Sequence, residues 1–218
     1  MKQTKVYSRR RTALRRILIA AAAYLLITRS LTVGVFLPGQ TLRYTEEREG
    51  TGWTSIVTRK WEPELHKTHM LYLSENEKVT MLSSTYLTIY GWMPDVGLAL
   101  DCSQDSPLFA GWWGMSRNGQ SVRYYFGRVD DPEIICLRIR LEYETWENET
   151  AQRHEGASFA LPDSAWTEKD GRRYFLIREP EIEWPEETRK FPVAAAYDAF
   201  GNIIAEFDME NYSFSSYG

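Results

Sequence analysis

The sequence is poor in the residues from which many catalytic and metal sites are built, with two cysteines and three histidines among 218 residues. It contains no P-loop and no dinucleotide-binding fingerprint. Ser116, in GMSRN, lacks the second glycine of a G-x-S-x-G nucleophile elbow. Thirty acidic residues are scattered along the chain, so no carboxylate pair for glycoside hydrolysis stands out. The sequence therefore predicts no catalytic residue, no cofactor and no enzyme.

The histidines do not form a convincing metal site. His66 and His69 make an H-x-x-H pair, which suits zinc when both imidazoles lie on one side of a helix. The segment around them leads into a strand, where residues three apart point to opposite faces. The acidic run at 130–133 is explained by an Asp-Asp-Pro turn. We predict no metal at either place.

A calcium loop is also excluded by spacing. Asp101, Ser103 and Asp105 occupy the first, third and fifth positions of such a loop. The sixth position is Ser106 where a glycine is needed, and the twelfth is Trp112 where a glutamate is needed.

No acidic residue precedes Glu46, and the charged residues among the first 16 are all basic: Lys2, Lys5, Arg9, Arg10, Arg11, Arg15 and Arg16. Residues 38–218 hold 18 basic and 30 acidic residues, a net charge of −12. A domain of this sign repels a phosphate backbone. Nucleic acid is therefore excluded as a partner of the folded part.

The segment from Ile17 to Leu37 is the most apolar of the chain and, as a helix, would span about 30 Å, the hydrocarbon thickness of a bilayer. Arg29 lies past its midpoint, from where a long side chain can reach the outer interface. The basic residues before the segment place the N-terminus inside. We predict a cytoplasmic stub at 1–16, one transmembrane helix at 17–37 and an extracytoplasmic remainder. A cleaved signal peptide and a buried helix are the alternatives.

The remainder is expected to be mainly β. Eight Trp, thirteen Tyr and nine Phe favour pleated, half-buried surfaces. In residues 135–144 apolar residues alternate with mostly charged ones, the pattern of a strand with one buried face. Hairpin turns are predicted at Asn118-Gly119, Asp170-Gly171 and Gly201-Asn202. This spacing predicts an antiparallel β-sandwich.

The domain boundaries follow from turn-forming residues. Proline, glycines and charges at 38–52 predict a tether, with a peripheral first strand as the alternative. YFGRVDDPEI at 125–134 and AYDAFGNII at 196–204 resemble small uncharacterised extracytoplasmic domains of Gram-positive bacteria. The resemblance covers the second half only and implies an immunoglobulin-like sandwich without a known activity. We therefore expect either one large β-sandwich or two small β-rich modules, at 53–129 and 130–218.

The expected function is binding of another protein or a component of the cell envelope. A carbohydrate-binding module and an envelope hydrolase are the alternatives. Trp112, Trp113 and Trp92 lie in glycine-flanked stretches and are the candidate binding surface. Because neighbouring residues on a strand point to opposite faces, one of Trp112 and Trp113 should be exposed. Cys102 and Cys136 are a candidate disulfide, since both would lie in an oxidising compartment.

Overall fold

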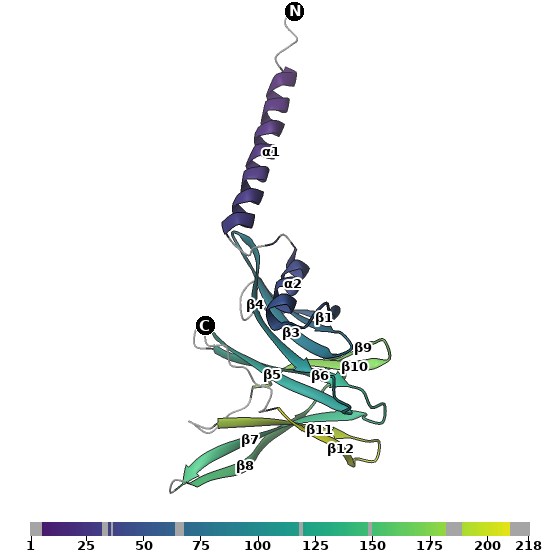
Figure 1. Cartoon of the computed structure of the whole chain (residues 1–218). Helices are drawn as coiled ribbons and strands as arrows, with labels where there is room; N and C mark the ends of the chain where they lie inside the picture. The colour runs from purple at the N-terminus through teal and green to yellow at the C-terminus, as the bar shows by residue number, and fades with distance from the viewer. Residues whose placement is uncertain are drawn as a thin grey trace, which may run out of the picture.

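A computed structural model shows, in the residues that it describes, a mainly β fold with two α-helices and three antiparallel sheets of four strands (Figure 1). It describes residues 6–31, 35, 37–63, 68–117, 120–147, 150–181 and 189–209. The helices are α1 (Val6–Leu31) and α2 (Pro38–Glu49). A 3-10 turn, η1 (Asp163–Ala165), precedes β9.

The first sheet is a meander in chain order. Its strands are β1 (Ser55–Trp61), β2 (His69–Glu75), β3 (Val79–Thr88) and β4 (Gly91–Asp101). The other two sheets combine strands that are distant in the chain. The central sheet has the order β5 (Leu108–Arg117), β6 (Gln120–Val129), β10 (Arg172–Arg178) and β9 (Trp166–Lys169). The last sheet has the order β12 (Ile203–Asp208), β11 (Arg189–Tyr197), β7 (Cys136–Glu147) and β8 (Thr150–Ala160).

The three sheets stack in layers, with the central sheet between the other two (Figure 1). The side chains of strand β6 explain this layered arrangement. Tyr124 and Phe126 pack into a core shared with the first sheet, whereas Tyr125 and Val129 pack into a second core shared with the last sheet. A strand that is apolar on both faces must be covered on both. The residues of β6 therefore require the two outer layers.

The pairing of β10 with β6 crosses the expected domain boundary. Residues 173–178 pair with 124–129 in one antiparallel ladder, so the hairpin β9–β10 of the expected second module completes the sheet of the first. The described residues between 53 and 209 consequently form one stack of sheets with no separation at 129/130.

Residues 38–49, expected to be part of a tether, form helix α2, which lies on the outer face of the first sheet (Figure 1). Pro38 is tolerated at the start because the first turn has no intrahelical acceptor for its missing N–H. Gly50 ends the helix in the left-handed conformation, with a φ of 66°. Leu42 and Thr45 are buried against the sheet. The tether prediction is wrong, because its proline and glycine are the end signals of a helix.

No helix, within the described residues, combines the length and the apolar character that crossing a bilayer requires. The predicted transmembrane helix from Ile17 to Leu37, and the single-pass localisation based on it, are therefore wrong. Helix α1 includes the arginine-rich segment. Its uninterrupted apolar run, Ile17 to Ile27, spans only about 16 Å, roughly half of a bilayer core. Leu37 lies outside this helix and precedes α2 as its N-cap.

The two cysteines are free, so the candidate disulfide is not formed in the structure. Cys102 follows β4 and is buried in the core between the first and central sheets, whereas Cys136 begins β7 in the last sheet. Burial raises the pKa of the Cys102 thiol. The thiol lies 3.5 Å from the Thr80 hydroxyl oxygen. Cys102 therefore behaves as a small core residue.

Candidate functional site

The hairpin β9–β10 turns at Asp170 and Gly171, as its sequence predicts. Both residues have positive φ, 52° and 77°, which suits a two-residue hairpin turn. The turn brings Lys169 and Arg172 from the central sheet to Glu75, at the end of β2 in the first sheet. The hairpin thus connects two layers through charged side chains.

Glu75 is the centre of this connection. Its side chain is 8% exposed, and its Oε1 lies 3.1 Å from Lys169 Nζ. The Ser55 hydroxyl oxygen lies 3.1 Å from the same oxygen, and Lys169 also donates to Ser55. Burial acts to raise the pKa of Glu75, but hydrogen bonds from Lys169 and Ser55 and the charge of Lys169 lower it below its ordinary value. Burial and the charge of Glu75 raise the pKa of nearby Tyr174 to about 12.

A second ion pair continues the network from the central sheet. The buried guanidinium of Arg128 lies 2.6 Å from Asp130 Oδ2, and Arg172 Nε lies 3.6 Å from Asp130 Oδ1. Arg172 therefore lies between Asp130 and Glu75 and is shared by both.

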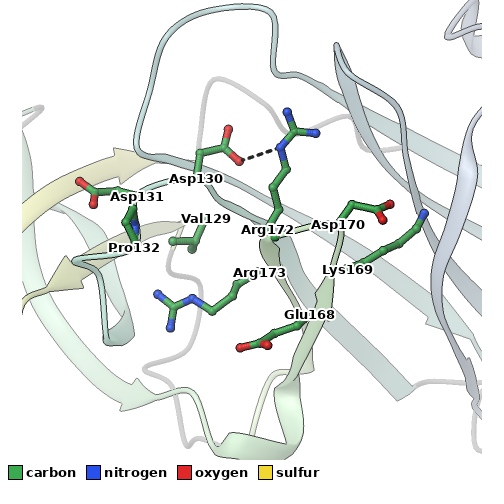
Figure 2. Close-up of a pocket in the computed structure, with 10 residues that line it drawn as sticks. Val129, Asp130, Asp131, Pro132, Glu168, Lys169, Asp170, Arg172 and Arg173 are labelled. Atoms are coloured by element: carbon green, nitrogen blue, oxygen red, sulfur yellow. Dashed lines mark ion pairs between the residues drawn. The ribbon is translucent and has the colours of Figure 1, made fainter.

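A cavity of about 540 Å³ opens beside this network (Figure 2). Its walls come from two segments, residues 129–132 after β6 and residues 168–173 of the β9–β10 hairpin. Figure 2 shows Arg173 pointing into the space between Pro132 and Glu168, while Lys169 points away. The Arg173 guanidinium carbon lies 5.2 Å from the centre of the Trp166 ring. Arg173 Nη2 is buried and has no hydrogen-bond partner among the described residues.

Trp112 and Trp113 do not form the predicted exposed surface. Trp113 is 3% exposed and stacks on Tyr124 in the core between the first and central sheets. Trp112 is half-buried, packs against the other core, and has the Arg123 guanidinium 4.4 Å from its ring centre. The two side chains do point to opposite faces, but the central sheet is covered on both.

Trp92 belongs to an exposed apolar region, the aromatic corner, at the end of the first sheet nearest α1. Trp61 and Trp92 meet edge to face with ring centres 6.3 Å apart. Trp92 is half-buried, and Ile89 at the β3–β4 turn is 80% exposed. The members of the corner are Trp61, Leu87, Ile89, Tyr90 and Trp92.

Helix α1 meets this corner at its C-terminal end. The Tyr24 hydroxyl donates a hydrogen bond to the Ile89 carbonyl oxygen at 3.2 Å. Val35 and Trp92 exchange two backbone hydrogen bonds of 2.8 and 2.9 Å. The corner therefore continues directly onto the helix.

The two described histidines, His69 and His154, lie in different sheets and do not come together. His66 lies outside the described residues. His69 is fully buried on β2, with Nε2 3.5 Å from Asp95 Oδ2, and His154 contacts Thr145 on the last sheet. Within the described part of the chain, no group of three or more His, Cys, Asp or Glu residues is arranged to hold a metal ion.

The acidic residues that were considered as cation ligands instead accept hydrogen bonds from nearby backbone N–H groups. Asp101 Oδ1 accepts the Ser103 N–H at 2.9 Å, and Asp131 Oδ1 accepts the Glu133 N–H at 2.8 Å. The Asp-Asp-Pro turn predicted at 130–133 accounts for the second of these contacts.

Sequence reasoning missed Trp61 and Arg173 as site residues. Trp61 ends a strand and gives no motif. For Arg173 a signal existed, because KDGRR places charges on both sides of a predicted hairpin turn. Which of these charges would lack a counterion depends on residues 40 or more positions away, such as Asp130.

Comparison of the chain with known protein families, with curated proteins and with solved structures finds no match to any of them.

Proposed function

We propose that this protein is a binding domain that docks a helix of a partner protein along α1 and onto the aromatic corner. The observation that carries the proposal is the exposure of apolar side chains along α1, which projects away from the sheets (Figure 1). Leu18 is 62% exposed and Leu26 is 70% exposed. A contiguous exposed apolar patch of this kind marks a site of interaction with another protein or with a membrane.

The chemistry of α1 indicates what the partner helix presents. Its first half exposes Arg11, Arg15 and Arg16, and its second half exposes apolar residues from Ile17 to Leu26. A complementary helix carries acidic residues opposite the arginines and apolar residues opposite the rest. Amphipathic helices that pair along their apolar faces are a recurring mode of recognition.

A second copy of this chain fits the surface less well. Two α1 helices side by side in parallel would bring their arginines together, which repel. An antiparallel pair would set arginines against apolar side chains, at the cost of desolvating a charge. The charge pattern therefore favours a different protein.

Site-specific photo-crosslinking in the cells that produce the protein tests this proposal. A photoreactive residue is placed at Ile19 on α1, at Tyr90 in the aromatic corner, or at Phe200, a 90% exposed residue beyond β11 that serves as control. We expect one protein to be captured from both Ile19 and Tyr90 but not from Phe200, with the crosslinks on a helix that carries acidic and apolar residues.

A charge-reversal variant of α1 tests whether the arginines contribute to binding. Replacing Arg11, Arg15 and Arg16 by Glu should lower the Ile19 crosslink at least tenfold, because two like-charged surfaces then face each other. Crosslinks to copies of this chain, to lipid alone, or equally from Phe200 would contradict the proposal.

A further inference from the structure

We propose that the cavity beside the β9–β10 hairpin binds a small zwitterionic molecule, of the amino-acid type, whose carboxylate lies on Arg173 and whose ammonium group lies near Glu168. The position of Arg173 carries this inference. Its guanidinium lies over Trp166, its Nη2 is buried, and among the described residues it makes no ion pair.

Arg173 as a whole is half-buried, but a buried N–H donor such as Nη2 is costly without an acceptor, because it has left water and found no replacement. Arginine presents its donors as a planar fork that matches a carboxylate with two parallel hydrogen bonds. A carboxylate entering the cavity would supply the acceptor that Arg173 Nη2 lacks.

The other cations of the cavity wall are already engaged. Lys169 is paired with Glu75, and Arg172 is shared by Asp130 and Glu75. Among the described residues, Arg173 is consequently the cation of this wall that lacks a counterion.

The acids of the wall indicate that the ligand also carries a positive charge. Asp130 is neutralised by Arg128, but Glu168 and Asp170 make no ion pair with any described residue. Glu168 is opposite Arg173 in the β9–β10 ladder and thus lies on the same face of the sheet. These carboxylates repel a phosphate dianion and attract an ammonium group. A volume of about 540 Å³ is in the range of small-molecule sites.

Isothermal titration of the full chain with a graded set of small probes tests the inference. Glycine, 4-aminobutyrate and 6-aminohexanoate carry the two charges at increasing separation, whereas acetate and inorganic phosphate carry negative charge only. We expect at least one of the three zwitterions to bind saturably and at least tenfold more tightly than acetate or phosphate.

Three variants assign the binding to the named groups. Arg173→Gln should weaken zwitterion binding at least tenfold, and Arg173→Lys should weaken it less, because it keeps the charge and loses the fork. Glu168→Gln should remove the difference in affinity between the zwitterion and acetate. Arg59→Gln, an exposed arginine on β1, is the matched control and should change nothing.

Thermal unfolding of each variant separates loss of binding from loss of fold. If Arg173→Gln does not fold, the Arg173→Lys and Glu168→Gln results decide. The inference is overturned if no zwitterion binds saturably, if phosphate binds more tightly than every zwitterion, or if the folded Arg173 and Glu168 variants bind like the wild type.

Discussion

Glu75 joins the first sheet to the central sheet through a single carboxylate. Its contacts with Lys169, Arg172 and Ser55 come from three strands in two layers. A nearly buried charge is tolerated only when it is paired and hydrogen-bonded, and removing one partner leaves the other unsatisfied. The hairpin β9–β10 thus depends on the ionised form of this residue.

The lowered pKa of Glu75 makes this contribution dependent on pH. Because the folded-state pKa lies below the ordinary 4.5, the stabilisation is complete above pH 4.5 and is lost as the pH falls through the folded value. At pH 7, Glu75→Gln should lower the free energy of unfolding by about 2 kcal/mol. At a pH below the folded-state pKa the wild-type residue is itself neutral, and the difference should vanish.

Urea unfolding of the wild type and Glu75→Gln at pH 7 and at progressively lower pH measures this effect. Glu77→Gln, an exposed neighbour in the β2–β3 turn, is the control and should differ little from the wild type at each pH. An equal loss in Glu75→Gln at neutral and acid pH would show that side-chain shape, rather than charge, is responsible.

Helix α2 depends on a close approach to β4. A Cβ added at Gly97 would overlap the methyl group of Thr45, whereas a Cβ added at Gly39, within α2, would meet nothing within 4 Å. The helix further contacts the sheet through Arg48, whose Nη1 donates to the Asp95 carbonyl oxygen at 3.2 Å. The absence of a side chain at Gly97 therefore allows α2 to pack closely on β4.

Gly97→Ala should lower the free energy of unfolding by about 1–3 kcal/mol, the usual cost of overpacking. Gly39→Ala should leave stability unchanged or raise it by up to about 1 kcal/mol, since alanine restricts the unfolded chain. Chemical denaturation of both variants measures the difference, and limited proteolysis after α2 reports whether the helix has lifted. Equal stability of the two variants would show that α2 does not pack on β4 as described.

Elements set by local residues could be predicted from the sequence, whereas contacts between distant elements could not. The Asp170-Gly171 hairpin and the alternation in β7 depend on neighbours within a few positions, and the structure contains both. Alternation correctly put Trp112 and Trp113 on opposite faces. It could not tell that a further layer covers each face, because that depends on β10 joining β6 from more than 40 residues away.

The candidate site was predicted less well for the same reason. Trp92 alone of the three nominated tryptophans lies in an exposed region, and Arg173 is distinguished only by the counterion it lacks. A helix signal in 38–49 was misread because Pro38 and Gly50 mark helix ends as well as loops. The residue types along the chain indicate where strands form. Which side chains are buried and which strands pair depends on contacts across the whole molecule.

At the scale of the whole molecule, the central sheet makes the layers interdependent. One of its faces contributes to each core, with Phe126 on one face and Phe175 on the other. Residues 53–129 lack the pair β9–β10 that completes the central sheet, and residues 130–218 lack β5 and β6. Each fragment would expose an apolar sheet face to water, which costs about 25 cal/mol for every Å² left uncovered.

We therefore predict that neither 53–129 nor 130–218 folds alone and that the two together recover native structure when mixed. The measurement is the dispersion of amide resonances in proton–nitrogen NMR spectra of each fragment, of the mixture and of 35–218, with urea unfolding of the last as the reference. The chain 35–218 should unfold in one cooperative transition, because each core needs residues from both halves. A dispersed spectrum with cooperative unfolding from 130–218 alone would instead show that the last sheet and the β9–β10 hairpin form an independent domain.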